Sequence, residues 1–280
     1  MVRFALLLPT IVLIGCFFAW PAANLISLSL KPSSAASSPD VTFTLSNYWL
    51  LTSEPVYRTT LLRSMRLAIE CTAICIAVGY PYAYLLSRAK GLLRAAMLTA
   101  AVLPLVLNLL ISTFSWMVVL QRKGVINWLL TSLHLLEEPV GFLHTEGAVL
   151  VGMTYVVLPL MILPVFSVLL RTDPAFTETA RTLGAGPVRA FWHVLLPLSL
   201  PGTIVGSLLV YVSSFGLYLV PELLGGPRFT LFPFLIQQQV LMLLNWPLAS
   251  ALSVVLVLAI IPALVAAQWI FWKTVEGDTP

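Results

Sequence analysis

The sequence predicts an all-α membrane protein that crosses the bilayer with six helices. Of its 280 residues, 59% are hydrophobic and only 9% are charged, whereas a soluble domain has about 25% charged residues. The hydrophobic residues form long runs, and about 20 mostly apolar residues are enough for a spanning helix. Backbone polar groups in lipid need partners within the chain, so these runs are expected to be helices. The composition excludes a soluble enzyme, a nucleic-acid-binding protein and a disordered linker.

Each spanning helix is predicted from one hydrophobic run. In chain order the runs are Phe4–Leu30, Leu67–Leu86, Ala95–Leu120, Ala148–Leu170, Pro201–Val220 and Leu248–Trp272. The first run includes Leu13–Cys16, which is similar to a lipoprotein cleavage site. Apolar sequence continues well past that cysteine, so we expect a retained anchor helix rather than a cleaved signal.

The positive charges of the loops indicate how the chain is oriented. Basic residues are divided almost equally between the two sets of loops, so their number alone does not decide the orientation. The short segment Arg88–Arg94, however, contains three basic residues and no acidic one. Because dense positive charge favours the cytoplasmic side, we expect both termini to be cytoplasmic.

No metal site or catalytic site is expected in this chain. Its cysteines lie inside apolar runs, where a free cysteine behaves as a small hydrophobic residue, and its three histidines are scattered. Nucleophile, base and orienting residue are not found together, and the sequence lacks a phosphate-binding loop of the Gly-x-x-x-x-Gly-Lys-Ser/Thr type. We therefore expect no cofactor here, and ATP with its Mg²⁺ would have to bind to a partner.

The loop after the fourth run, Arg171–Leu200, has the most distinctive pattern. Asp173 and Pro174 predict a helix start, with the aspartate as N-cap and the proline at the first helical position. Gly184 predicts the end of that helix, and Pro187 the start of a second short helix that ends near Leu195. Such a loop could fit a groove on a partner protein or lie on the lipid headgroups, and its pattern leaves both readings open.

This loop resembles the EAA loop of binding-protein-dependent ABC transporter permeases. That family's pattern is Glu-Ala-Ala, three residues, Gly, nine residues, Ile, one residue and Leu-Pro, and the matching positions here are Glu178, Thr179, Ala180, Gly184, Val194, Leu196 and Pro197. Threonine replaces the first alanine, and valine replaces the isoleucine. Further similar segments are Gly79–Ala83, Gly124–Asn127, Leu223–Gly226 and Asn245–Pro247, and together they are most similar to the polyamine-type subfamily.

The resemblance implies a type I ABC importer permease fold and a set of partners. It implies a permease core over residues 60–272, preceded by a helix and periplasmic loop (1–59) and followed by a cytoplasmic tail (273–280). The implied partners are a cytoplasmic ATPase dimer, a second homologous permease subunit and a periplasmic solute-binding protein. The implied substrate is a polyamine or related small amine, with aminophosphonates, amino acids, opines and ferric ions as alternatives. A secondary transporter or channel is the alternative class, which internal repeats and intramembrane charges would favour.

Candidate substrate-pathway residues come from the fifth run and the loop after it. Tyr211, Phe215 and Tyr218 follow helical spacing, and Glu222 continues it. A row of aromatic side chains that ends at a carboxylate suits an organic cation, although aromatic side chains in such a row also serve helix packing. Elsewhere, Arg66 and Glu70 are spaced to form an ion pair on one helix face, and the glycines at 202 and 206 would allow close helix contact.

Overall fold

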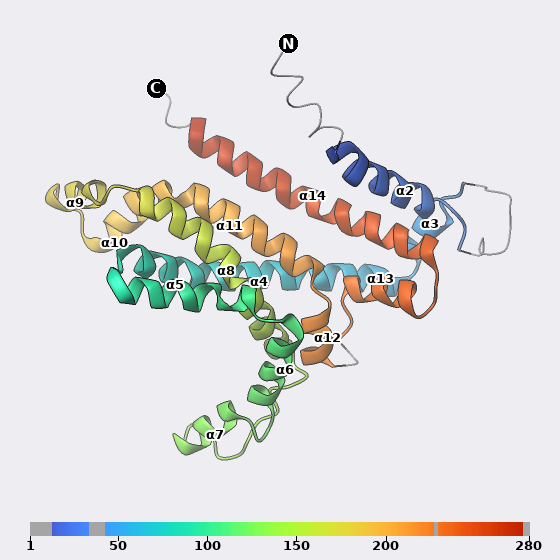
Figure 1. Cartoon of the computed structure of the whole chain (residues 1–280), viewed down its shortest axis with the longest axis horizontal. Helices are drawn as coiled ribbons and strands as arrows, with labels where there is room; N and C mark the ends of the chain where they lie inside the picture. Colours follow the sequence, from blue (N-terminus) through green and yellow to red (C-terminus); the bar gives the residue numbers. More distant parts are fainter. Residues whose placement is uncertain (1–12, 34–42, 227–228, 277–280) are drawn as a thin grey trace, which may run out of the picture. The chain divides into compact units, whose positions relative to one another are not determined.

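A computed structural model describes residues 13–33, 43–226 and 229–276 of the chain, and every regular element in these ranges is a helix (Figure 1). In chain order they are the π-helix η1 (Gly15–Ala19), α2 (Trp20–Ser29), α3 (Ser46–Ser53), α4 (Pro55–Arg88), α5 (Gly91–Val106), α6 (Leu109–Leu120), α7 (Val125–Ser132), α8 (Glu146–Arg171), α9 (Pro174–Thr182), α10 (Pro187–Ala190), the π-helix η3 (Phe191–Leu195), α11 (Leu196–Gly216), α12 (Leu219–Gly225), α13 (Phe232–Leu241) and α14 (Trp246–Glu276). The predicted all-α class is confirmed.

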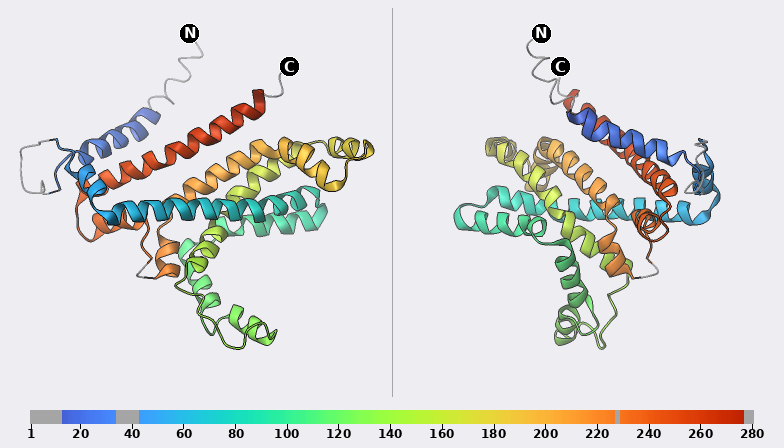
Figure 2. Two further views of the ribbon diagram at one scale, coloured as in Figure 1. Left: turned by 180° about the vertical axis from the view of Figure 1, so that it is seen from behind. Right: turned by 45° about the vertical axis from the view of Figure 1, so that its right-hand side comes forward.

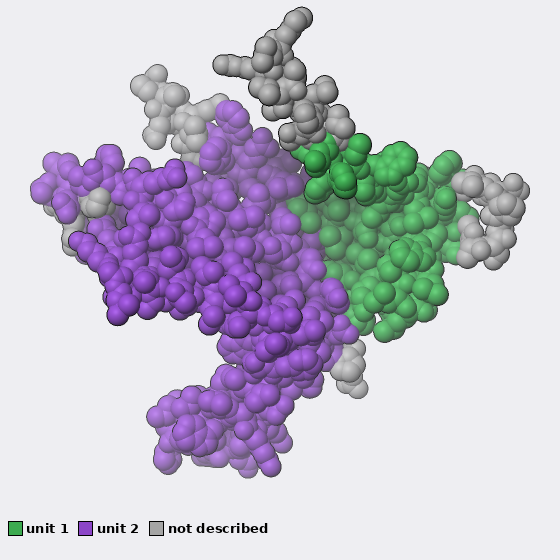
Figure 3. Space-filling model, viewed as in Figure 1, with its two compact units in different colours: residues 1–62, 231–260 green, residues 63–230, 261–280 purple. Residues whose placement is uncertain are grey.

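The chain divides into two compact units, which Figure 3 shows in different colours. Unit 1 comprises residues 1–62 and 231–260, and unit 2 comprises residues 63–230 and 261–280. The functional candidates of the fourth and fifth runs all belong to unit 2. The predicted limits of the permease core, at residues 60 and 272, stay a prediction.

Unit 2 is built around α8, which packs against α5, α6, α11 and α12. The views in Figures 1 and 2 agree in placing α8 and α11 side by side. Their contact is close because α11 presents glycines to α8. A Cβ added at Gly206 would lie 2.7 Å from the sulfur of Met161, and one at Gly202 would lie 2.8 Å from the carbonyl oxygen of Pro164. The predicted close helix contact at these glycines is confirmed.

Unit 1 has a small hydrophobic core of its own. Its fully or almost fully buried members include Phe232, Leu248 and Leu252. A buried amide ties the end of α2 to the start of α3, because Asn47 donates to the carbonyl oxygens of Ser29 and Lys31 at 2.8 and 2.7 Å. These bonds satisfy carbonyls at the end of α2 that have no partner within the helix.

The structure supports fewer spanning helices than the six predicted ones. Within the described residues, four stretches are long and apolar enough to cross a bilayer: Leu109–Ser132, Glu146–Arg171, Pro187–Gly216 and Trp246–Lys273. The second predicted span lies within the 34-residue helix α4. Residues 4–12 of the first predicted span lie outside the described ranges. The count of six therefore stays a prediction.

One predicted span, Ala95–Leu120, is divided in the structure. The chain is extended at Leu107, and α6 begins after Asn108, whose side chain accepts the N–H of Leu110 at 2.9 Å. Asparagine is among the best N-cap residues because its side-chain oxygen satisfies an N–H of the first turn. Hydropathy alone does not detect such a break, since the apolar composition continues across it.

Candidate functional site

The predicted first helix of the loop between α8 and α11 is present as α9. The carboxylate of Asp173 accepts the backbone N–H of Ala175 at 2.9 Å, so the predicted N-cap is confirmed. Glu178 and Thr179 lie exposed on this helix, and Ala180 is partly buried. A capped helix of this kind presents its side chains from a defined backbone rather than from an irregular loop.

Gly184 ends the segment in the way that its position predicts. Its φ is +88°, in the left-handed region that glycine adopts without strain. The N–H of Leu183 donates to the carbonyl of Thr179, and the N–H of Ala185 donates to that of Ala180, at 3.1 and 3.0 Å. These bonds satisfy the last carbonyls of the helix, as glycine-terminated helix ends do.

The second predicted helix is not a separate one, which corrects the sequence-based interpretation. Residues Pro187–Gly216 form one continuous 30-residue helical stretch made of α10, η3 and α11. Within η3 the N–H of Leu196 donates to Phe191, five residues back. This wider turn changes the hydrogen-bond pattern just before Pro197, which has no N–H to donate, so the proline does not end the helix. Val194 and Leu196 are partly buried there, whereas Pro197 is exposed.

Aromatic contacts connect η3 to the bundle. The ring of Phe191 meets that of Tyr80 on α4 edge to face, with centroids 5.7 Å apart, and it meets Trp192 in the same way at 5.6 Å. The buried hydroxyl of Tyr80 is hydrogen bonded to that of Ser199 on α11 at 2.7 Å. Segments more than a hundred residues apart in sequence are thus held together at the base of the loop.

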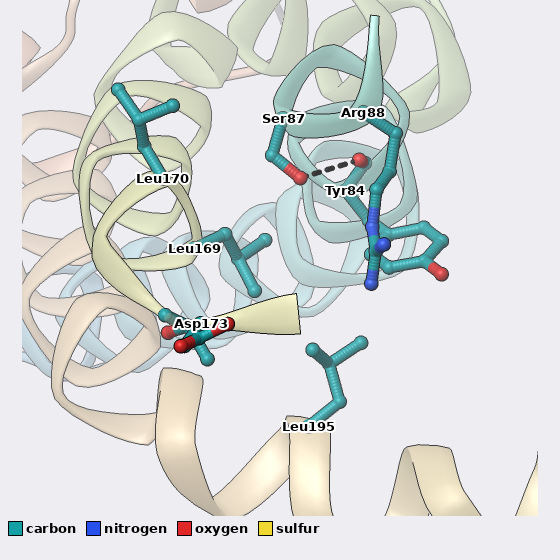
Figure 4. Close-up of a pocket in the computed structure, with 8 residues that line it drawn as sticks. Tyr84, Ser87, Arg88, Leu169, Leu170, Asp173 and Leu195 are labelled. Carbon is teal, nitrogen blue, oxygen red and sulfur yellow. Dashed lines mark hydrogen bonds between the residues drawn. The ribbon is translucent and has the colours of Figure 1, made fainter. Parts of the chain in front are cut away.

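Apolar side chains are exposed around this loop. Phe176, Leu183, Val188 and Trp192 are each more than half exposed. A pocket of about 90 Å³ is lined by residues from the ends of α4 and α8, by Leu195 of η3 and by Asp173, which precedes α9 (Figure 4). A second groove of about 380 Å³ runs along Pro187–Leu195. Exposed apolar surface of this kind marks a contact with a partner protein or with the membrane.

The predicted aromatic stripe is interrupted. Tyr211 and Phe215 are buried in α11 and stack with centroids 6.0 Å apart and planes inclined by 8°. The helix ends at Gly216, so Tyr218 and Glu222 do not continue its face. Pro221 explains the break, because proline crowds the carbonyl four residues earlier and cannot donate to it. The role of these four residues in a substrate pathway stays a prediction.

In α12 the predicted pathway residues are more accessible. Tyr218 is 38% exposed and precedes the first turn of the helix, and the N–H of Glu222 donates to its carbonyl at 3.0 Å. Glu222 as a whole residue is partly buried.

The predicted Arg66–Glu70 ion pair is confirmed and has a third member. The guanidinium Nε of Arg66 lies 3.4 Å from Glu70, and its Nη2 pairs with Glu146 at the start of α8. All three side chains are at least a third exposed, so the pair contributes little to stability. Sequence spacing could not reveal Glu146, which lies 76 residues beyond Glu70.

Comparison with known proteins places the whole chain in one group. The family described as "Binding-protein-dependent transport system inner membrane component" matches residues 1–271. The spermidine/putrescine transport system permease protein PotB of Haemophilus influenzae is 34% identical over 248 residues, which cover 86% of each chain.

Two solved structures resemble the fold. One is a bacterial ABC transporter involved in the import of the acidic polysaccharide alginate, with a TM-score of 0.71. The other is the bacterial alginate ABC transporter in complex with an alginate pentasaccharide-bound periplasmic protein, with a TM-score of 0.69. Each is 17% identical to this chain and matches 99% of it and 96% of the solved chain. At this identity the likeness concerns the fold alone.

Proposed function

Because the chain belongs to the family of binding-protein-dependent transport system inner membrane components, we propose that it is the permease subunit of an ATP-driven importer of polyamines. Its apolar helices agree with a multi-pass protein of the inner membrane. The polyamine substrate is proposed from the 34% identity to a spermidine/putrescine permease across most of both chains.

The observation that carries the coupling role is the exposed apolar surface around α9 and η3. Phe176, Val188 and Trp192 are more than half exposed on a segment whose helix is capped at Asp173. We propose that a cytoplasmic ATPase dimer, which binds ATP and Mg²⁺, covers this surface. Burial of exposed apolar side chains would supply most of the binding free energy.

The remaining partners follow from the same proposal. A second, homologous permease subunit completes the pathway, and a periplasmic solute-binding protein delivers the substrate. The solved alginate transporter in complex with its periplasmic protein gives an example of the last kind of assembly in this fold. In this arrangement α9 faces the cytoplasm, and both termini lie on the cytoplasmic side.

Reconstitution tests the proposal. The chain is produced together with an ATPase, a second permease and a binding protein, which we expect neighbouring genes to encode, and the complex is placed in proteoliposomes. We expect uptake of labelled spermidine that requires ATP and the binding protein. Uptake without ATPase would support a secondary transporter or channel instead. An aminophosphonate, an amino acid, an opine or ferric ion that displaces spermidine from the binding protein, and is itself imported, would replace the polyamine as the substrate.

A further inference from the structure

A groove along α6 combines aromatic rings with hydroxyl groups. It has a volume of about 270 Å³ and lies between α6 and α8 in unit 2. Its lining includes Ser112, Ser115, Trp116 and Tyr155, with aliphatic Ile111 and Val119 beside them. None of its lining residues carries a charge. The groove is separate from the loop between α8 and α11 and from the predicted residues of α11 and α12.

The two rings of the groove form an edge-to-face pair. The centroids of Trp116 and Tyr155 lie 5.6 Å apart, and their planes are inclined by 67°. In this arrangement the ring that contributes its edge keeps both of its faces clear of the other ring. Both side chains are only partly buried. A ring face that is accessible in an apolar groove attracts organic cations through its electron density.

The hydroxyl groups have unused hydrogen-bonding capacity. Ser112 is only 6% exposed, and its buried Oγ has no hydrogen-bond partner in the described part of the chain. Ser115 donates to the carbonyl of Ile111 at 2.8 Å and retains its lone pairs as acceptors. Within the described residues, the Tyr155 hydroxyl likewise makes no hydrogen bond. A buried, unpaired hydroxyl costs free energy, so such a group calls for an explanation.

We propose that this groove is a transient site for one alkylammonium segment of the substrate on its way through the permease. The inference rests on the proposed function and assigns a place to its substrate. The ring faces would hold the ammonium group, the hydroxyl oxygens would accept its N–H groups, and Ile111 and Val119 would contact the neighbouring methylenes. The lack of a carboxylate keeps binding weak, which suits a site that the substrate must leave quickly.

The test measures how many spermidine molecules are imported per ATP hydrolysed in proteoliposomes of the complete transporter. Trp116→Leu should lower this ratio by about three- to tenfold, the range expected for loss of one cation–π contact. ATP hydrolysis stimulated by the loaded binding protein should stay near that of the unchanged protein, because the variant acts after delivery. Trp116→Phe should restore most of the ratio, since it keeps a ring face.

Two further variants separate ligand contact from packing. Ser112→Ala removes the unpaired hydroxyl and should lower the ratio without lowering the melting temperature of the complex. Trp128→Leu is the matched control, because Trp128 is 66% exposed on α7 and does not line the groove. Its ratio should be unchanged.

Distinct outcomes would overturn the inference and the proposed function. If the unchanged transporter imports spermidine and Trp116→Leu does so with the same ratio, the groove is not a substrate site. Equal falls in import and ATP hydrolysis, with loss of the second permease on purification, would show that the groove is a helix-packing surface. If the unchanged transporter imports no polyamine at all, the proposed function itself is wrong.

Discussion

Gly184 illustrates how one backbone conformation can determine the shape of a functional loop. Its φ of +88° allows the chain to turn back after α9, and a Cβ added there would meet nothing within 4 Å. A substitution therefore strains the backbone without any clash inside this chain. Two residues later, Gly186 has an ordinary φ of −62° and equally open surroundings. The two glycines thus form a matched pair for experiment.

We predict that Gly184→Asp abolishes uptake, because the left-handed backbone is strained by about 1–3 kcal/mol and the added side chain blocks the approach of the ATPase. Gly186→Ala, which adds a methyl group at an ordinary φ, should leave uptake nearly unchanged. The measurements are co-purification of the ATPase with the permease and ATP hydrolysis stimulated by the binding protein. Normal values of both for Gly184→Asp would show that this loop does not couple the two proteins.

A second prediction concerns the carboxylate of Glu222. If it guides a cationic substrate, Glu222→Gln should slow uptake at limiting substrate several-fold, since the amide keeps the size of the side chain and removes its charge. Assembly with the ATPase and the second permease should be unaffected. Uptake equal to that of the unchanged protein would indicate that Glu222 and Tyr218 serve packing and not the substrate pathway.

At the scale of elements, the sequence predicted features that depend on residues a few positions apart. It did not predict contacts between residues that lie far apart in the chain. The N-cap at Asp173 and the turn at Gly184 depend on residues a few positions apart, so the sequence predicts both. The contact between Trp116 and Tyr155, by contrast, joins α6 to α8, and nothing in the spacing of one helix reveals its neighbour. Prolines misled the sequence-based interpretation of Pro187–Gly216, because a π turn accommodates Pro197.

The hydrogen bond between Tyr80 and Ser199 gives a prediction about helix packing. It joins α4 to α11 at 2.7 Å in a buried position. Tyr80→Phe should lower the free energy of unfolding by about 1 kcal/mol, while the ring contact with Phe191 remains possible. Ser199→Ala should have a similar effect, and the double variant should lose little more than either single variant. Thermal unfolding in detergent is the measurement, and fully additive losses would contradict a shared bond.

For the molecule as a whole, composition predicted the class, whereas packing determined the details. Low charge and long apolar runs suffice to predict membrane helices. They do not locate the break at Asn108 or the one after Gly216, because hydropathy is nearly the same on both sides of each. The substrate site is harder still to predict, since the residues that line a groove come from separate helices.

The predicted orientation can be tested on the intact chain. A reporter fused after Trp272 should behave as cytoplasmic, and one inserted near Ser37, which lies outside the described residues, should behave as periplasmic. The reason is the dense positive charge of Arg88–Arg94, which favours the cytoplasmic side. The reverse pattern of reporter activity would place α9 in the periplasm and exclude its contact with a cytoplasmic ATPase.

The continuity of Pro187–Gly216 has a mechanical consequence. At 1.5 Å per residue, a stretch of 30 residues is a rod of about 45 Å. A tilt of about 10° about a point midway between Trp192 and Phe215 moves each of these two ends by about 3 Å, in opposite directions. The glycines that bring α11 against α8 lie between these ends and would act as the fulcrum. A flexible joint at Pro197 would not transmit that movement from one end to the other, whereas an unbroken helix transmits it along its whole length.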